Sequence, residues 1–227
     1  MTDMNWLLLQ SGNCAPAFNM AFDEALLEAM PRLQKPVLRF YGWTEPAATF
    51  GYFQKFSEVS AATLLRPLIR RPTGGGFVPH AADWTYSLSF PTGHEWYALK
   101  ATESYERIHK WMQRAFSRLA VETELAPCCQ KSLPGQCFVG HEKSDLLWRG
   151  KKIAGAAQRR TRGGLLIQGS VQPPLSLSRP VWEIAMKEVG RLALGAELNF
   201  KLEELVLRRV EELVHDKYTT VAYNQKR

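Results

Sequence analysis

The sequence of 227 residues predicts an α+β fold with a mixed, largely antiparallel sheet packed with helices. Residues 84–90 alternate between apolar and small polar side chains, which is the period of a β-strand. Segments with helical spacing, such as 16–31 and 102–121, stand between strand-like segments without the regular alternation of a parallel α/β sheet. Short glycine-containing turns join strand-like segments between residues 144 and 172, and such turns connect antiparallel strands.

The N-terminal half contains one predicted helix and several short strands. Residues 16–31 carry apolar side chains at helical spacing between two prolines, which we expect to bound the helix. Residues 37–43 and 47–53 are rich in aromatic and apolar side chains and are separated by a turn, so we expect two strands. The alternation at 84–90 predicts a strand buried on one face only.

The C-terminal half continues with a helix over residues 102–121, whose apolar side chains form one stripe. A loop rich in Pro, Gly, Gln and Cys follows at about 126–137. Three strands joined by tight turns are then expected over residues 144–148, 151–160 and 165–172.

No linker, internal repeat or low-complexity tract divides the chain. Its length is enough for one large core. We therefore expect a single domain over residues 1–227, with two amphipathic helices at about 181–216 as an extension of it.

The charge balance favours acidic partners. The chain has 29 Lys and Arg against 22 Asp and Glu, a formal charge of +7. No nucleic-acid-binding module interleaves these basic residues with aromatic ones, so no nucleic-acid partner is expected. The N-terminus lacks the features of a signal peptide, and no apolar run reaches the length of a membrane span. These observations predict a cytoplasmic protein without a membrane partner, whose four cysteines are thiols.

The stretch "RRPTGGGFVPH" at residues 70–80 contains three consecutive glycines. Bare backbone lets a ligand approach closely and exposes N–H groups to it, although a plain tight turn would also use glycine. Arg70 and Arg71 could hold a phosphate by charge-assisted hydrogen bonds. The pattern is neither a P-loop nor a dinucleotide-binding fingerprint. From these residues alone, His80 could equally be an ordinary surface or satisfied histidine.

Cys137 and Lys152 are the candidates for chemistry in the second half of the chain. Cys137 follows a polar Pro-Gly-Gln loop, where a thiol is either reactive or simply an inert small residue. Lys152 begins the small, apolar run "IAGAA", so its stem could be buried with the amine aimed at a ligand, or it could be solvated. A zinc site of Cys128, Cys129, Cys137 and His141 is disfavoured, since no CxxC pair is present.

Together these stretches resemble a known superfamily. "RRPTGGGFVPH" with "DWTYS", and "CF" with "DLLWRGKKIAGAAQRRTRGGLLIQGS", are similar to motifs of the lipoate–protein ligase, octanoyltransferase and biotin ligase superfamily. "NMAFDEAL" and "LRFYGWTEPAATFGYFQ" match its lipoyl branch. The resemblance extends from about residue 5 to residue 172 and follows the order of the family's motifs.

The resemblance implies a lipoate–biotin ligase-like catalytic domain with a tunnel for an eight-carbon acyl or lipoyl chain. It implies that the glycine stretch lies along the acyl group and that Lys152 donates to the acyl carbonyl. Gly155 would keep the strand open for the ligand. The implied substrate-binding residues are Arg71, Gly74, Gly75, Gly76, His80 and Gly155. The family commonly has an acid directly after the histidine, where this chain has Ala81, and the next acid is Asp83.

Within the superfamily, Cys137-Phe138 resembles the nucleophile motif of the ligase-like octanoyltransferases. The resemblance implies that octanoyl–acyl carrier protein loads Cys137 as a thioester and that a lysine of a lipoyl-domain protein accepts the octanoyl group. Catalysis by Cys137 and Lys152 would then require no metal and no cofactor. Both implied partners are typically acidic proteins, which fits the positive charge of the chain.

Three alternatives remain open at this stage. An ATP-dependent lipoate–protein ligase would use ATP and Mg²⁺, with Arg70, Arg71 and the glycines on adenylate phosphates. An octanoyl amidotransferase would take the octanoyl group from an amide on another lipoyl-domain protein. A carrier-binding scaffold without catalysis would leave Cys137 and Lys152 unexplained. The residues alone also leave open whether the chain carried is octanoyl or lipoyl.

Overall fold

The computed structural model describes residues 6–131, 138, 140–173, 177–194, 198–199 and 204–226. Its centre is one mixed sheet, in which the β1 pairings are parallel and the pairings from β2 to β7 are antiparallel. In spatial order the strands are β13 (Leu198–Asn199), β1 (Trp6–Cys14), β2 (Val37–Trp43), β6 (Trp84–Pro91), β12 (Gly164–Val171), β11 (Lys151–Arg160), β10 (Leu146–Trp148) and β7 (Glu124–Leu125). The predicted α+β fold with a mixed, largely antiparallel sheet is confirmed.

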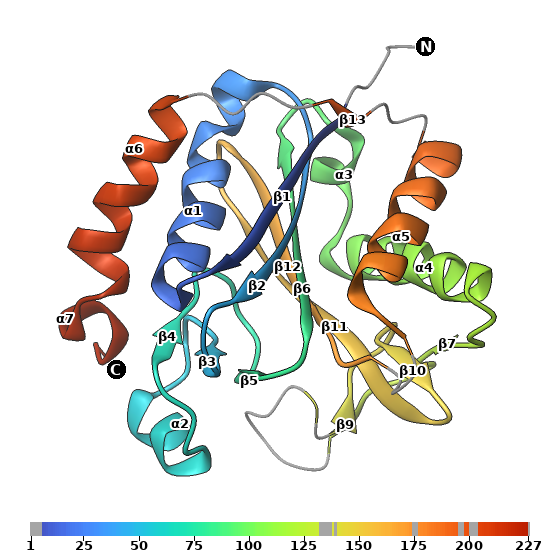
Figure 1. The fold of residues 1–227 in the computed structure, drawn as a ribbon, viewed down its shortest axis with the longest axis horizontal. Helices are drawn as coiled ribbons and strands as arrows, with labels where there is room; N and C mark the ends of the chain where they lie inside the picture. The colour runs from blue at the N-terminus through green and yellow to red at the C-terminus, as the bar shows by residue number, and fades with distance from the viewer. Residues whose placement is uncertain are drawn as a thin grey trace.

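Helices cover both faces of this sheet (Figure 1). One face carries α1 (Pro16–Leu33), with α6 (Glu204–Leu213), the short π-helical segment η1 (Val214–Tyr218) and α7 (Val221–Asn224) beyond it. The other face carries α3 (Glu95–Ala98), α4 (Ala101–Arg118) and α5 (Arg179–Leu194). A separate apolar core lies on each side of the sheet. None of the helices in the described residues is long and apolar enough to cross a membrane.

A small three-stranded sheet projects from the end of the α1 side (Figure 1). It consists of β4 (Leu68–Arg70), β3 (Ala47–Phe50) and β5 (Val78–His80), with α2 (Phe56–Ala62) beside it. A two-residue pairing joins β8 (Gln130–Lys131), which lies within the stretch expected to be a loop at about 126–137, to β9 (Gly140–His141), which lies after it.

Strand β6 differs from its prediction because both of its faces are buried. The apolar face packs into the core against α4 and α5. The Ser and Thr face is covered by α1, where Ser87 donates to Asp23 Oδ1 at 2.7 Å. Asp23 is fully buried and is paired with the fully buried Arg39 at 2.8 Å. Small hydroxyl side chains therefore serve a buried polar network here, and not a solvent-facing surface.

Helix α1 differs in its C-terminal boundary. Pro31 lies inside the helix, which continues to Leu33 and ends at Gln34 with a left-handed φ of 49°. The apolar stripes expected in α4 and in the C-terminal helix α6 are buried, as Ile108 and Met112 in α4 and Val206 and Val210 in α6 show. The expectation of one domain over 1–227 stays a prediction.

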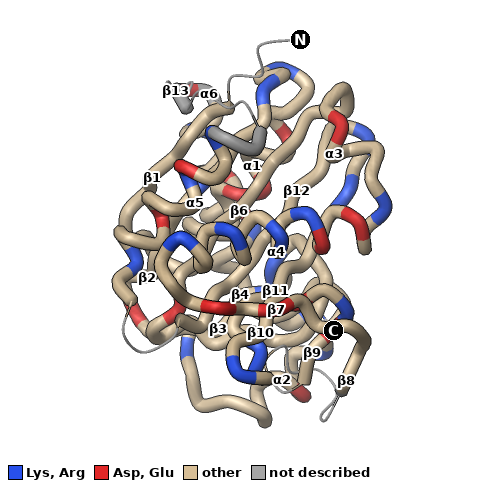
Figure 2. Tube along the Cα trace, turned by 90° about the vertical axis from the view of Figure 1, so that its right-hand side faces the viewer, with Lys and Arg blue, Asp and Glu red and all other residues tan. Residues whose placement is uncertain are grey.

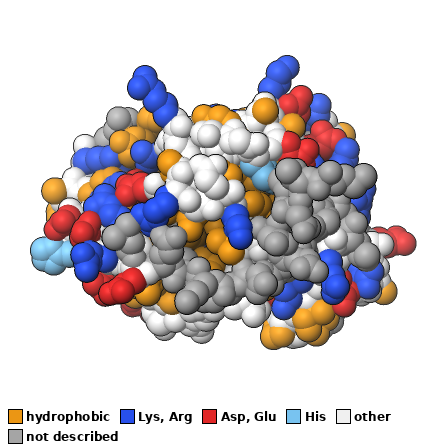
Figure 3. Space-filling model, turned by 90° about the horizontal axis from the view of Figure 1, so that it is seen from above, with side chains coloured by type: hydrophobic (Ala, Val, Ile, Leu, Met, Phe, Trp, Pro, Cys, Tyr) orange, Lys and Arg blue, Asp and Glu red, His pale blue; other side chains and the backbone are white. Residues whose placement is uncertain are grey.

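Charged residues are spread over the chain. Figure 2 shows Lys and Arg interspersed with Asp and Glu along many elements. Figure 3 shows one face with hydrophobic side chains and a basic one near the centre, and with both basic and acidic side chains towards its sides. Among the residues that the structure describes, neither view presents a single basic stripe.

Candidate active site

A cavity of about 470 Å³ lies between the β11–β12 part of the large sheet and the small sheet. Such a volume is typical of a small-molecule site. The two strands contribute side chains from one face, since Gly155 pairs with Ser170 and Ala157 pairs with Gln168. The rest of the wall comes from the small sheet, the glycine stretch, Phe138, the segment between β9 and β10, and the start of β11. These residues include Thr49, Arg71, Gly75, Gly76, His80, Phe138, Glu142, Asp145 and Lys152.

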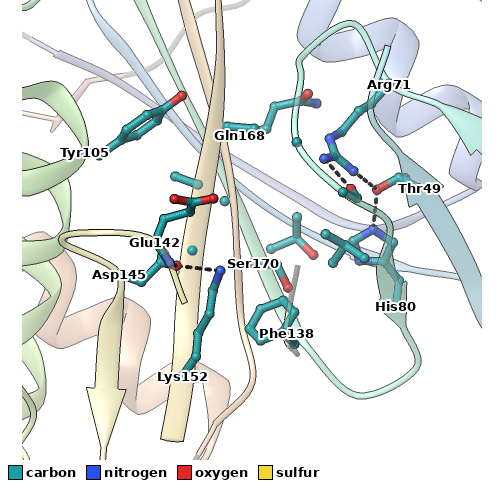
Figure 4. Close-up of a pocket in the computed structure, with 18 of the residues that line it drawn as sticks. Thr49, Arg71, His80, Tyr105, Phe138, Glu142, Asp145, Lys152, Gln168 and Ser170 are labelled. Atoms are coloured by element: carbon teal, nitrogen blue, oxygen red, sulfur yellow. Dashed lines mark hydrogen bonds and ion pairs between the residues drawn. The ribbon is translucent and has the colours of Figure 1, made fainter. Parts of the chain in front are cut away.

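Lys152 and Asp145 form one side of the cavity (Figure 4). Lys152 Nζ lies 2.7 Å from Asp145 Oδ2, and each side chain is only 7% exposed. The same carboxylate oxygen accepts from the backbone N–H of Glu142 at 2.7 Å. The amine also lies 5.2 Å from the centroid of the Phe138 ring. A buried ammonium is thus held in place by a carboxylate at the edge of an open cavity.

The hairpin of β10 and β11 explains the ion pair between Asp145 and Lys152. Asp145 lies just before β10, and Lys152 is the second residue of β11, so the hairpin brings the two together. His109 of α4 is buried behind them and bonds to the backbone oxygen of Ser144 through Nδ1 at 2.6 Å. Burial lowers the pKa of His109 to about 4, although the nearby Asp145 opposes that shift. The imidazole is therefore neutral at neutral pH and does not compete with Lys152 for the carboxylate.

Gly155 provides the space in which the Lys152 side chain lies. A Cβ atom at residue 155 would be 2.6 Å from Lys152 Cε and 2.7 Å from its Nζ. It would also approach Asp145 Oδ1 to 3.2 Å. The bare backbone here makes room for the lysine, and Gly155 also lines the cavity; the role toward a ligand that the resemblance implies stays a prediction.

We expect Gly155→Ala to displace the Lys152 amine and to lower the acyl transfer that the resemblance implies by on the order of 10²-fold, because small displacements of catalytic groups have effects of that size. The measurement is a steady-state rate of acyl transfer, with circular dichroism to verify folding. Gly93→Ala is the matched control, since a Cβ at residue 93 meets nothing within 4 Å. Equal rates in Gly155→Ala and wild type would contradict the role of this space.

The glycine stretch forms the opposite side of the cavity. Arg71 donates to the Gly74 carbonyl at 2.6 Å and to the Gly76 carbonyl at 2.7 Å, so the guanidinium fastens the loop. Gly75 has a left-handed φ of 84°. Its carbonyl would lie 1.9 Å from a Cβ at residue 51, so Gly51 is needed for the close approach of the two loops. Gly75 and Gly76 line the cavity.

Arg70 does not face this cavity. Its side chain is fully buried and donates to the carbonyls of Tyr52 and Gln54 at 2.7 Å each and to that of Asn224 at 3.0 Å. Its backbone N–H donates to Asn224 Oδ1 at 2.8 Å. The suggested use of Arg70 as a phosphate ligand conflicts with this burial.

His80 lies beside Thr49 and Arg71, across the cavity from Lys152 (Figure 4). Its Nδ1 is 2.8 Å from Asp83 Oδ2, and its Nε2 is 2.8 Å from Thr49 Oγ1. Asp83 thus partners the histidine from three residues away, although Ala81 stands where the family commonly has an acid.

The structure brings together most of the predicted site residues. Arg71, Gly75, Gly76, His80, Lys152 and Gly155 all line the cavity. The Gly74 carbonyl accepts a hydrogen bond from Arg71. Cys137 lies outside the described residues. Sequence reasoning missed Asp145 and Thr49 as members of the site. Asp145 stands in the quoted "DLLW" motif, which was the one signal for it.

No group of three or more potential metal ligands is present in the part of the chain that the structure describes. The zinc grouping considered above includes Cys137, so it is not tested by these residues. His141, another member, bonds through Nδ1 to the carbonyl of Cys128 at 2.9 Å.

Known proteins share this fold. A bi-partite lipoate protein ligase from Thermoplasma acidophilum superposes with a TM-score of 0.77 at 18% identity, covering 98% of this chain and 96% of that one. The fold is therefore that of the lipoate–protein ligase catalytic domains. The Lipoyl protein ligase A/B catalytic domain family matches residues 15–179, and the chain belongs to this family.

Two curated relatives refine this placement. Octanoyltransferase LipM of Anoxybacillus flavithermus is 35% identical over 179 residues, which are 73% of this chain and 64% of that protein. Octanoyltransferase LipM of Bacillus subtilis is 32% identical over 228 residues, which are 92% of this chain and 82% of that protein. The chain thus matches less than two thirds of the Anoxybacillus protein's length and more of the Bacillus one.

Proposed function

We propose that this chain is an octanoyltransferase of lipoate biosynthesis. It transfers an octanoyl group from octanoyl–acyl carrier protein, through a thioester on Cys137, to a lysine of a lipoyl-domain protein. The similarity to octanoyltransferases over most of the chain supports the reaction. The Thermoplasma ligase of the same fold was studied with its E2 lipoyl domain, which supports an acceptor of that kind.

The observation that carries the proposal is the buried Lys152 ammonium at the edge of a cavity that is largely lined by apolar surface. A fixed ammonium can donate to the carbonyl oxygen of an acyl group and stabilise the negative charge that develops on it. The Gly155, Ala156 and Ala157 backbone leaves room for an extended acyl chain alongside. Phe138, which follows Cys137 in the sequence, also lines this cavity.

A thiolate suits the proposed intermediate. It is a strong nucleophile and a good leaving group, so the transfer divides into a nearly isoenergetic thioester exchange and a downhill conversion of the thioester to the amide. First the Cys137 thiolate attacks the carrier thioester and the carrier thiolate leaves. The acceptor amine then attacks the Cys137 thioester, forming the amide and releasing the Cys137 thiolate. Neither step consumes ATP, so we propose that no metal or nucleotide is required. A cytoplasmic location stays a prediction.

Intact mass spectrometry after mixing the protein with octanoyl–acyl carrier protein, without ATP, tests the proposal. We expect the protein to gain the mass of one octanoyl group, bound in a form that hydroxylamine removes. Adding an apo lipoyl domain should discharge the adduct and octanoylate the domain.

Other results would point to the alternatives. Modification of the lipoyl domain only with ATP, Mg²⁺ and free octanoate or lipoate would replace the proposal with a ligase. An adduct formed from an octanoylated lipoyl domain, and not from the acyl carrier protein, would identify an amidotransferase. Lack of any transfer with all three donors would contradict an acyltransferase.

A further inference from the structure

The cavity wall opposite Lys152 carries a chain of three hydrogen-bonded side chains. Asp83 Oδ2 lies 2.8 Å from His80 Nδ1, and His80 Nε2 lies 2.8 Å from Thr49 Oγ1. All three are buried, and Thr49 and His80 line the cavity. Figure 4 shows His80 and Thr49 connected on the side of the cavity away from Lys152. An acid, an imidazole and a hydroxyl in this order can move a proton.

The partners of each atom fix the direction of the hydrogen bonds. A carboxylate only accepts, so the His80 nitrogen that faces Asp83 carries a proton. In the neutral imidazole, Nε2 is then the acceptor and takes the hydrogen bond from the Thr49 hydroxyl. Arg71 Nη1 donates to the same hydroxyl oxygen at 3.4 Å, which also leaves the hydroxyl proton directed at His80.

The surroundings hold the imidazole in one orientation. Its ring stacks on Trp43 with centroids 3.9 Å apart and an interplanar angle of 21°. Asp83 Oδ2 is further fixed by the hydroxyls of Ser170 at 2.6 Å and Thr85 at 3.1 Å. Asp83 Oδ1 is buried without a hydrogen-bond partner among the described residues. This buried carboxylate is placed to stabilise an imidazolium at His80.

A second pocket of about 270 Å³ lies on the outer side of the stacked Trp43 and His80 rings. His80 therefore forms part of the wall between two cavities. The charged and titratable groups that line these cavities or bond to His80 and its partners are Tyr41, Glu45, Arg71, Asp83, Tyr105, His141, Glu142, Lys143, Asp145, Lys152 and Arg179.

We propose that Thr49, His80 and Asp83 form a proton relay that deprotonates the acceptor lysine, an inference that rests on the octanoyl transfer proposed above. The acceptor arrives as an ammonium and cannot attack until it loses a proton. One N–H proton passes to Thr49 Oγ1 while the Thr49 hydroxyl proton passes to His80 Nε2. The neutral amine then attacks the thioester carbonyl, and the imidazolium remains paired with Asp83.

Lys152 is less suited to that task. Its ammonium already donates to Asp145, so it is arranged to stabilise negative charge on the acyl oxygen. The relay lies across the cavity from it (Figure 4). The acyl carbonyl would thus have a hydrogen-bond donor on one side and a proton acceptor for the amine on the other. The second proton of the amine is released to solvent when the tetrahedral intermediate collapses and the thiolate leaves.

The test separates discharge from loading. Octanoyl-enzyme is prepared from octanoyl–acyl carrier protein, purified, and mixed with an apo lipoyl domain, and loss of the adduct is followed by intact mass spectrometry across a range of pH. In His80→Ala and in Thr49→Val we expect discharge to slow about 10²-fold or more, since general bases contribute effects of that size. Thr49→Ser keeps the hydroxyl and should retain most of the rate.

Two readouts distinguish a relay from a merely structural role. Added imidazole should restore discharge in His80→Ala in proportion to its concentration, because it can occupy the place beside Trp43. In the wild type the discharge rate should fall on the acid side of the pH profile. The pH at which it falls should differ between His80→Ala and the wild type. His215→Ala is the matched control, since His215 pairs with Asp216 at 2.7 Å but is 89% exposed and away from the cavity.

The outcomes are separable from those of the proposed function. If wild-type protein forms no octanoyl adduct with any donor, the octanoyltransferase proposal fails and the relay fails with it. If the adduct forms, and Thr49→Val and His80→Ala discharge it at the wild-type rate with the wild-type pH profile, the relay alone is overturned. Slow discharge in His80→Ala without rescue by imidazole, together with normal discharge in folded Thr49→Val, would also overturn it.

Discussion

Cys137→Ser will form no octanoyl adduct that hydroxylamine removes, and transfer from acyl carrier protein to the lipoyl domain will fall below detection. Serine has the same shape but is a far weaker nucleophile at neutral pH than a thiolate. The measurement is intact mass spectrometry with octanoyl–acyl carrier protein, combined with octanoylation of an apo lipoyl domain.

Cys128→Ser and Cys129→Ser are matched controls for this prediction. Both cysteines are exposed and precede Cys137 in the same part of the chain. We expect both variants to form the adduct at the wild-type rate. Loss of the adduct in all three variants, or its persistence in Cys137→Ser, would remove Cys137 as the nucleophile.

Lys152→Met will lower octanoyl transfer by roughly 10²- to 10³-fold, which is the range for loss of one oxyanion donor. The stem is preserved, so the loss reports the ammonium. The substitution also leaves Asp145 buried without its partner, for which we expect a fall of about 3 kcal/mol in the free energy of unfolding. Single-turnover transfer and urea denaturation measure the two effects.

A double variant separates catalysis from stability. Lys152→Met with Asp145→Asn removes the unpaired charge, so stability should recover while transfer stays low. Lys151→Met is the control for a neighbouring lysine, since Lys151 is exposed at the start of the same strand. Recovery of transfer in the double variant would show that Lys152 acts only through folding.

The sequence predicted the fold class because strand periodicity, helical spacing and turn glycines are local patterns. Most of the cavity residues were predicted only through the resemblance of separated motifs to a known superfamily, since each residue alone also fitted an ordinary structural role. Asp145 was missed because nothing local distinguishes a buried carboxylate from an ordinary turn acid, and its partner comes seven residues later through a hairpin with a register shift. Thr49 was missed because its hydroxyl acquires its role only when β5 pairs with β3.

The error at β6 has a similar origin. Ser and Thr fit a solvent-facing surface and a buried polar layer equally well, and only the long-range position of α1 decides between them. Charged side chains are rarely buried, so no local rule predicts that Asp23 and Arg39 lie together beneath that helix. The alternation predicts the strand itself, whereas the burial of its polar face depends on the packing of α1.

The bonds between Arg70 and Asn224 have a consequence for how the protein is made. Arg70 leads directly into the glycine stretch, and both its backbone and its side chain depend on a residue 154 positions later. While the ribosome is still translating, the nascent chain can form α1 and its local strands, but the buried guanidinium lacks this partner. The strand that leads into the glycine stretch therefore reaches its final hydrogen bonding only after residue 224 has emerged.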